Sequence, residues 1–232
     1  MAHTKIKQCM LSWFENALIE ALLGASETSG RNYMSMPNYR DRQKSSIVRV
    51  AREILADEGL AGLQARKIAN AADCSVGTIY NLFGSLDMVV IFANAETLNE
   101  LHDDLVRAKS SAAAFHQQLE ALAQAYLGFA MRRTPEWRAL FEHRFTTKTT
   151  VPEWYLQAQA DVFAIVEELL RPTIVADHSR SEAARALFSA VHGVVCIALD
   201  QKLGAFDGSA AERQVHFIVK SIAHGINDNH RD

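Results

Sequence analysis

Apolar residues recur every three or four positions along most of the chain, which is the period of an amphipathic helix. The pattern predicts one helix from about residue 44 to residue 58, which Gly59 ends. It predicts a short helix from Ala65 to Ala72 and a second from Val76 to Phe83, which Ser75 is placed to cap. Strand-like alternation is missing over any useful length.

Longer helices are expected after Gly84. Their predicted extents are 86–108, 112–133, 135–145, 153–170, 181–203 and 209–225. Pro135, Pro152 and Pro172 fall at the starts of these segments or just past their ends, where proline disturbs a helix least. The chain is therefore expected to be all-α, with short helices first and a larger helical body after them.

A polar, turn-rich stretch from residue 25 to residue 39 sets the N-terminal segment apart. Before this stretch, Glu15 and Glu20 interrupt the apolar run that a signal peptide requires. The segment is either an accessory helix or an upstream extension of a chain that starts naturally at Met34 or Met36. No run approaches the roughly 18 apolar residues of a membrane span, so we expect a cytoplasmic protein without a membrane partner.

The formal net charge of the 232 residues is −3, so nucleic-acid binding would depend on a local concentration of cations. Residues 40–52 supply one, because five basic residues there face one acidic residue, a balance of +4. A basic segment ahead of a helix bundle suits contact with phosphates. A merely solvated charged surface is the alternative interpretation.

Residues for other chemistry are scattered or absent. The three cysteines form no CxxC pair, which argues against a zinc cluster or a disulfide framework and fits a reducing compartment. The nine histidines show no metal-like pairing, and the chain has no GxSxG, HExxH, Walker or GxGxxG motif. We therefore expect no catalytic residue, no metal, no cofactor and no enzyme activity.

The two short helices form a helix-turn-helix pattern that needs the preceding helix behind it. Short helices bury little surface alone, and the third helix completes a small core with Leu60, Ile68, Ile79 and Phe83. In such a unit the second short helix enters the major groove and presents its N-terminal residues to the base edges. A helical hairpin inside an ordinary bundle is the alternative interpretation.

The same stretch resembles the TetR family of bacterial regulators. The matching positions are Ala51, Glu58-Gly59, Ile68-Ala69, Ala72, Ser75, Gly77-Thr78-Ile79-Tyr80 and Phe83. This ordered set, which covers roughly residues 44–92, is far more specific than any single motif. The resemblance implies that Thr78, Tyr80 and the start of the 65–72 helix face DNA.

Three positions depart from the family pattern. Asp73 replaces the usual turn glycine, and it tolerates left-handed backbone less well than glycine but better than most residues. Gln64 replaces the serine or threonine that usually caps the first short helix. Leu86 replaces a phosphate-contacting lysine, which lowers the DNA affinity that we expect.

Together these features define a candidate DNA-binding set and three regions. The set comprises Arg42, Lys44, Gln64, Ala65, Arg66, Ser75, Val76, Thr78, Tyr80 and Asn81. The expected regions are an N-terminal extension (1–39), a three-helix DNA-binding domain (40–92) and a helical ligand-binding and dimerisation domain (93–232).

The helical body is rich in aromatic residues, most of which are expected to pack in a core. Regulators that this chain resembles hold a largely apolar effector pocket there. Short motifs around Trp137, His192 and Gly193 also resemble the C-terminal subclass named for Trp, His and Gly. The candidate effector-binding residues are Tyr126, Phe129, Trp137, Phe141 and His192. His192 is interpreted either as a buried structural histidine or as a ligand-sensing donor.

The last two predicted helices, 181–203 and 209–225, carry broad apolar faces. Two such pairs would form a four-helix interface between subunits, as the resemblance also implies. The leading hypothesis is a homodimeric, ligand-responsive repressor that binds a near-palindromic double-stranded operator and a mostly apolar small-molecule effector. The alternative is a helical small-molecule-binding protein with weak or lost DNA binding.

Overall fold

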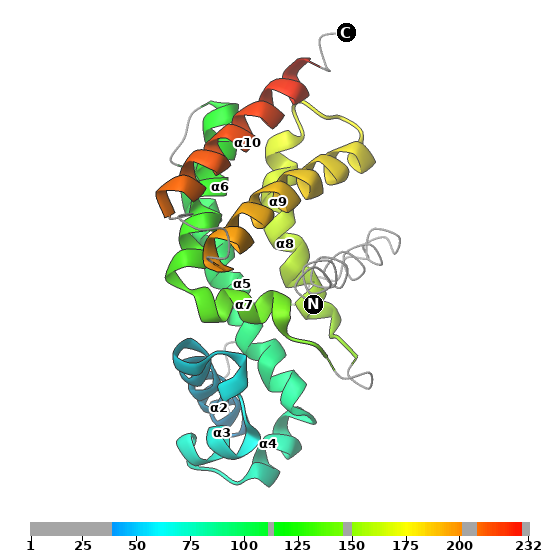
Figure 1. Ribbon diagram of the computed structural model, residues 1–232. Coiled ribbons are helices and arrows are strands. Elements are labelled where there is room, and N and C mark those ends of the chain that lie inside the picture. Colours follow the sequence, from blue (N-terminus) through cyan, green and yellow to red (C-terminus); the bar gives the residue numbers. More distant parts are fainter. Residues whose placement is uncertain (1–38, 111–113, 146–149, 201–207, 229–232) are drawn as a thin grey trace. The chain divides into compact units, whose positions relative to one another are not determined.

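A computed structural model describes residues 39–110, 114–145, 150–200 and 208–228 (Figure 1). In these residues every element is a helix, which confirms the predicted all-α class. The elements are α2 (Tyr39–Glu58), the 3-10 helix η1 (Leu60–Gly62), α3 (Ala65–Ala71), α4 (Val76–Phe83), α5 (Leu86–Ser110), α6 (Phe115–Arg132), α7 (Thr134–Glu142), α8 (Glu153–Leu170), α9 (Asp177–Asp200) and α10 (Gly208–Asp228). The predicted N-terminal segment, with Met34 and Met36, lies outside the described residues.

The chain forms two compact units, and each is assembled from two separate stretches. The first unit holds the described residues up to Thr97 together with Pro135–Ala158. The second holds Leu98–Thr134 and the described residues from Gln159 onward. Consequently α7 and the start of α8 belong with the short N-terminal helices. The region boundaries expected at residues 39 and 92 stay predictions.

The core of the first unit is built from the apolar faces of α2, α3 and α4. Ile47, Ile68 and Ile79, one from each helix, have no exposed surface. Phe83 and Leu55 complete the buried contact, and Leu60 packs against it from η1. The predicted small core is thus present. Burial against α2 and against each other stabilises the two short helices α3 and α4, because isolated helices of their length are marginal in water.

Local signals set the ends of these helices. Ser75 Oγ accepts a hydrogen bond from the Thr78 amide at 3.0 Å, which confirms Ser75 as the N-cap of α4. Gly59 ends α2 with φ 67°, and Asp73 takes the turn between α3 and α4 with φ 49°. Gln64 makes no capping bond from its side chain at the start of α3. The expected departures at Asp73 and Gln64 are therefore visible in the backbone.

Two polar contacts hold α7 and the residue after it against α5 within the first unit. The Asn94 amide donates to the Ala139 carbonyl at 3.1 Å. That carbonyl is one of the last four of α7, which lack partners inside the helix. One turn further on, His143 Nε2 lies 3.1 Å from Asp87 Oδ1. Burial lowers the pKa of His143, and the Asp87 carboxylate opposes that effect.

In the second unit α10 packs along α6 and against α9 (Figure 1). The turn before α9 is closed by the buried Arg180, which donates to the carbonyls of Ile174 and Val175. This closure lets α9 begin at Asp177 rather than at residue 181, as the apolar pattern had suggested, and residues 201–203 lie outside the described part.

By length and composition α9 could cross a membrane, and α4 with α5 passes the same test only as a pair bent by 70°. A core helix of a globular protein also passes this test. Leu187, Val191 and Val195 are buried within the chain, so part of the apolar surface of α9 already packs on protein.

Candidate nucleic-acid interface and effector site

One side of α4 and its cap form an accessible polar surface. Ser75, Tyr80 and Asn81 are exposed, and Tyr80 keeps 47% of its surface accessible although it is a large aromatic residue. Thr78 is half-buried, and its hydroxyl lies 2.9 Å from Ser75 Oγ. Val76 packs partly against the core. Opposite this surface, Ile79 and Phe83 anchor α4 in the core, so the helix has one buried and one available face.

The start of α3, the helix before α4, carries an exposed cation, Arg66. Arg66 is exposed, and the hydrogen bonds and ion pairs given for the described residues do not include its side chain, whereas Lys67 pairs with Glu58. Gln64 is exposed and donates weakly to the Ala61 carbonyl at 3.4 Å, and Ala65 is half-buried. Of the predicted residues on α3, Arg66 is therefore the one best suited to contact phosphate.

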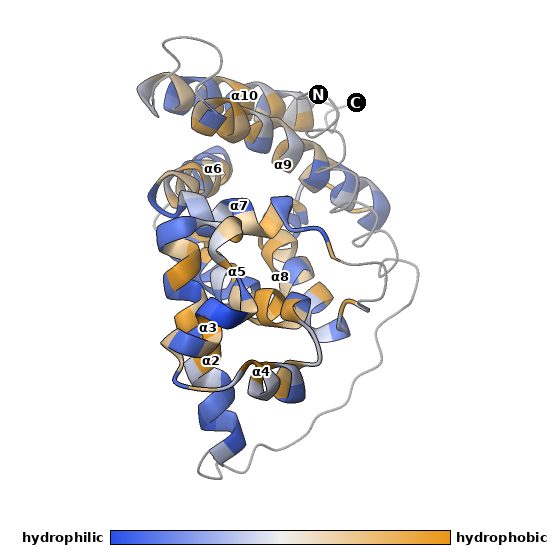
Figure 2. Ribbon diagram, turned by 60° about the horizontal axis from the view of Figure 1, so that its bottom comes forward, coloured by the Kyte–Doolittle hydropathy of each residue, from blue (hydrophilic) through white to orange (hydrophobic). Residues whose placement is uncertain are grey.

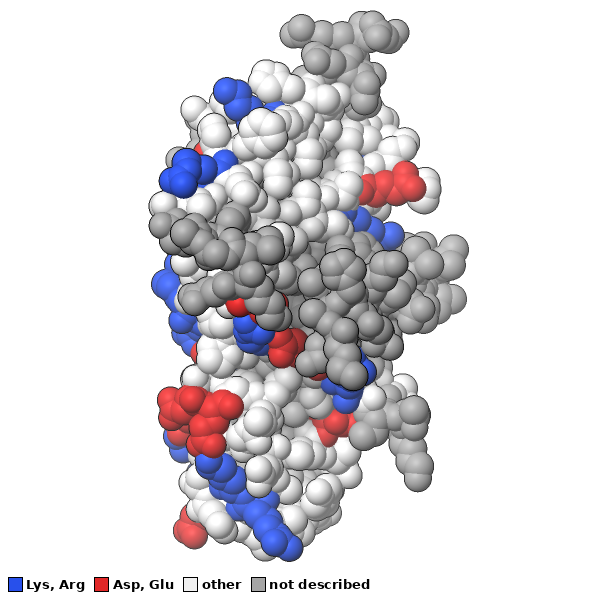
Figure 3. Space-filling view, in the orientation of Figure 1, with Lys and Arg blue, Asp and Glu red and all other residues white. Residues whose placement is uncertain are grey.

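The first turns of α2 are hydrophilic where the basic segment begins (Figure 2). Arg42 is exposed, and Arg40 donates to the Asn81 carbonyl at 3.5 Å. Lys44 is half-buried, and its ammonium lies 5.9 Å from the ring centroids of both Phe83 and Phe92. Figure 3 shows a continuous band of Lys and Arg at the end of the molecule that holds α2, α3 and α4.

Three of the predicted effector residues lie in the second unit, and all three are buried. A hydrogen bond of 2.8 Å joins the Tyr126 hydroxyl and His192 Nδ1. The Phe188 ring stacks on His192 with centroids 5.1 Å apart. Burial lowers the pKa of His192 to about 4, so the imidazole is neutral at pH 7. Phe129 is also buried, with 2% of its surface exposed.

The other two predicted effector residues lie in the first unit. Trp137 and Phe141 pack ring to ring with centroids 4.9 Å apart, and both are buried. The sequence also suggested that Tyr126, Trp137, Phe141 and His192 border one cavity, and that stays a prediction. The structure assigns Tyr126 and His192 to the second unit and the other two to the first. The hydrogen-bonded, stacked group of Tyr126, Phe188 and His192 agrees with the structural interpretation of His192 and does not exclude the sensing one.

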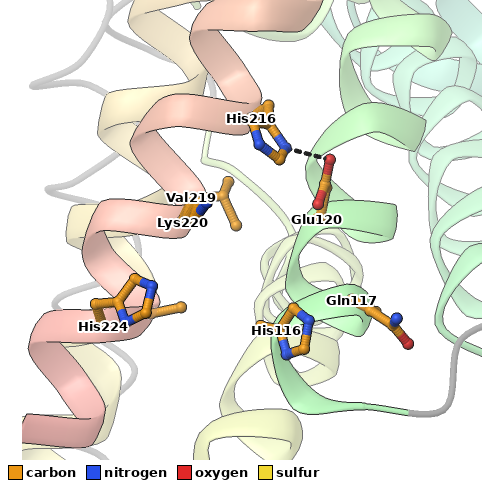
Figure 4. A pocket seen from close by; sticks show the side chains of 8 residues that line it. His116, Gln117, Glu120, His216, Val219, Lys220 and His224 are labelled. Atoms are coloured by element: carbon orange, nitrogen blue, oxygen red, sulfur yellow. Dashed lines mark hydrogen bonds and ion pairs between the residues drawn. The ribbon is translucent and has the colours of Figure 1, made fainter.

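A separate groove lies between α6 and α10 in the second unit, with a volume of about 390 Å³. Its polar lining comprises His116, Gln117, Glu120, His216, Lys220 and His224. At one end His216 Nδ1 contacts Glu120 Oε1 at 2.6 Å (Figure 4). The groove contains none of the predicted effector residues. Across the described part of the chain, no three His, Cys, Asp or Glu residues are grouped so that they could hold a metal ion.

An N-terminal and a C-terminal part of the chain each match a known protein family. Residues 47–88 match the family described as bacterial regulatory proteins, tetR family. Residues 119–222 match the tetracyclin repressor-like C-terminal domain. These two ranges cover more than half of the chain. The chain belongs to the TetR family of transcriptional regulators. The Trp-His-Gly subclass stays a prediction, because the matched description does not name it.

Individual relatives are more distant. An HTH-type transcriptional regulator of Mycobacterium tuberculosis is 27% identical over 104 residues, which are 44% of this chain and 44% of that protein. The TetR-family chain thus spans less than half the length of the curated relatives that it matches. A regulator of Mycobacterium bovis gives the same values.

Solved structures share the fold at low identity. A protein of unknown function from Rhodococcus sp. RHA1 has a TM-score of 0.65 and 18% identity, covering 84% of this chain and 98% of its own. A TetR variant from Acinetobacter baumannii AYE in complex with minocycline has a TM-score of 0.59 and 16% identity, covering 81% and 97%.

Sequence reasoning left three residues out of the candidate site that the TetR fold brings to it. Arg40 contacts α4, and its i, i+4 spacing from Lys44 was the available signal. Phe92 lies under the Lys44 ammonium, and Trp154 packs on Phe92 with centroids 4.9 Å apart. No sequence signal joins Phe92 to Trp154, because they are distant in the chain and meet only after folding.

Proposed function

We propose that this protein is a homodimeric regulator that binds operator DNA through α4 and represses transcription until a small effector releases it. The observation that supports DNA binding most directly is the exposed polar side of α4 beside the cations of α2 and α3. The α4 residues provide hydrogen-bonding groups for base edges, and Arg42 and Arg66 provide charge for phosphates. We propose that it acts in the cytoplasm, because the matched family is one of bacterial regulatory proteins and bacterial DNA lies in that compartment.

Salt dependence tests the DNA-binding proposal. We expect binding of the wild-type protein to a mixed-sequence duplex to weaken linearly with the logarithm of salt concentration, because each neutralised phosphate releases counterions. Leu86→Lys adds a cation after α4 and is expected to steepen this dependence by about one unit. Absence of salt-dependent binding to random or selected duplexes would favour the alternative, a helical small-molecule-binding protein.

We infer that the effector-binding site includes the buried ring group of Tyr126 and His192. Its support is chemical: aromatic surface surrounds one neutral hydrogen-bonding pair, as in sites for largely apolar ligands. The minocycline complex of the Acinetobacter protein shows that a relative with this fold holds a small molecule. Phe129 of the same unit is proposed as a further part of this site.

The groove between α6 and α10 provides the comparison that tests the effector site. A compound that raises the melting temperature of the wild-type protein should lose this effect in Tyr126→Phe and keep it in His216→Ala. The opposite result would place the effector in the groove. Native mass spectrometry of the purified protein would identify a ligand that co-purifies.

A further inference from the structure

A chain of aromatic contacts in the first unit runs from a cation of α2 to a tryptophan of α8. The Lys44 ammonium lies 5.9 Å from the centroids of Phe83 and of Phe92. The two rings meet edge to face with centroids 5.5 Å apart. Phe92 then packs on Trp154 at 4.9 Å. Side chains of α2, α4, α5 and α8 therefore form one connected group.

Lys44 and Arg40 occupy the same face of α2, one turn apart, and both reach the C-terminal end of α4. Arg40 contacts the Asn81 carbonyl, and Lys44 lies over the ring of Phe83, the last residue of α4. Carbonyl groups at this end have no helical partners, so the end attracts cations. Both positive charges are thus held beside the helix that we propose to enter the major groove.

Phe92 is half-buried and its ring contacts the rings of both Phe83 and Trp154. Without the indole, the Phe92 ring would gain freedom, and one of the two rings that order the Lys44 ammonium would no longer be held in place. An unheld lysine stem has several rotatable bonds that must be fixed before it can meet a phosphate. Order in this one cation therefore depends on a residue of α8.

We propose that Trp154 controls the DNA contact of Lys44 by holding Phe92 in place, which gives α8 a direct influence on DNA affinity. This inference rests on the proposed DNA binding. Phosphate contact through Lys44 is strong when Trp154 packs on Phe92 and weak when it does not. The effect is independent of base sequence, because a phosphate contact carries no sequence information.

A double-mutant cycle on a mixed-sequence duplex tests the inference. Lys44→Met should lower the slope of log affinity against log salt by about one unit. Trp154→Leu should weaken binding roughly two- to fivefold, the range expected for loss of a cation–π contact. In the Lys44→Met background the same Trp154→Leu change should have no further effect. Trp154→Phe, which keeps an aromatic ring, should restore binding.

Controls separate this effect from loss of fold. Lys109→Met removes a lysine of the second unit that pairs with Glu168, and the Trp154→Leu effect should persist in that background. Melting temperatures are measured for each variant. If Trp154→Leu lowers the melting temperature, the cycle is repeated with Phe92→Leu, for which the same non-additivity is expected.

The outcomes are distinct. Equal weakening by Trp154→Leu with and without Lys44 overturns the inference and leaves the proposed DNA binding intact, as does unchanged affinity in Trp154→Leu. A wild-type protein that binds no duplex at any salt concentration overturns both.

Discussion

Thr78 combines an observed contact with the cap of α4 and a proposed contact with DNA. Its hydroxyl lies against Ser75 Oγ, which also accepts the Thr78 amide, so the hydroxyl takes part in capping α4. In the proposed complex, the methyl group of Thr78 could contact a thymine methyl. Its hydroxyl could donate to an acceptor on a base edge. Substitutions that separate the methyl from the hydroxyl therefore distinguish capping from recognition.

Thr78→Ala is expected to reduce discrimination between a selected operator and a scrambled duplex, at a cost of about 1–3 kcal/mol. Arg42→Ala should weaken binding to both duplexes alike, because it removes only charge. Thr78→Val keeps the methyl and Thr78→Ser keeps the hydroxyl, so fluorescence titration of the two variants shows which group reads the base. Equal loss on both duplexes in Thr78→Ala would contradict a base-edge role.

His192 makes stability depend on pH in a defined direction. Burial lowers its pKa from 6.5 to about 4, so the unfolded chain binds the proton more readily than the folded chain does. Stability from this residue is therefore fully present above pH 6.5 and is lost as pH falls toward 4. Between pH 7 and pH 5 the expected loss is about 2 kcal/mol.

Urea denaturation of the wild-type protein and of His192→Asn at pH 7 and pH 5 measures the contribution of His192 to the free energy of unfolding. His143, whose pKa is also lowered, contributes to both proteins, so the difference between them isolates His192. The variant should be less stable at pH 7 and should lose less stability on acidification. Parallel pH profiles would show that His192 does not carry the effect.

Among the elements, α3 begins without a side-chain hydrogen bond from its N-cap residue. Its N-cap, Gln64, has the extended backbone of a cap residue but makes no side-chain bond to the amides that follow. Gln64→Ser should supply that bond and raise the free energy of unfolding by about 1 kcal/mol. Chemical denaturation measures the change, and Gln64→Ala is the control that should not stabilise. Because Gln64 is exposed, no core packing is disturbed.

The position of α7 in the first unit is determined by its contacts with α5 and not by its own sequence pattern. Its pattern predicted a helix over 135–145, and the structure has one that ends at Glu142. The Ala139 carbonyl, which has no partner within α7, accepts a hydrogen bond from Asn94 of α5. The His143 side chain contacts Asp87 of the same helix. Periodicity indicates the helix, but only the fold assigns it to the first unit.

At the scale of the whole molecule, the proposed dimer depends on surface that a single chain leaves open. Phe217 of α10 is 71% exposed, and nothing lies within 4 Å of a Cβ built on Gly193 of α9. Val194, in contrast, is buried within its own chain, so a charge there would disturb folding rather than test association. Phe217 is therefore the informative position.

Phe217→Asp is expected to raise the dimer dissociation constant by about two to four orders of magnitude, because two phenyl groups worth about 1.5–3 kcal/mol each lose their burial. Sedimentation analysis measures the shift, and DNA binding should weaken with it. Val175→Asp, at a position 84% exposed in the turn before α9, is the matched control and should remain dimeric. A dimeric Phe217→Asp protein with normal DNA affinity would falsify this interface.

The sequence by itself determined the features that depend on neighbours in the chain. Helical periodicity, the Ser75 cap, and the Gly59 and Asp73 turns were all readable, because backbone sterics and capping act within a few residues. The ordered motif around Gly77-Thr78-Ile79-Tyr80 indicated the family, which the matched families confirm.

Only the tertiary structure decided the features that join distant residues. It divided the five predicted effector residues between two units, paired Tyr126 with His192, and placed Lys44 against Phe92 and Trp154. Each of these contacts closes a long loop of chain and is made possible by the burial of whole helix faces. Periodicity shows that a face is apolar, but packing of the complete chain selects the face that it meets.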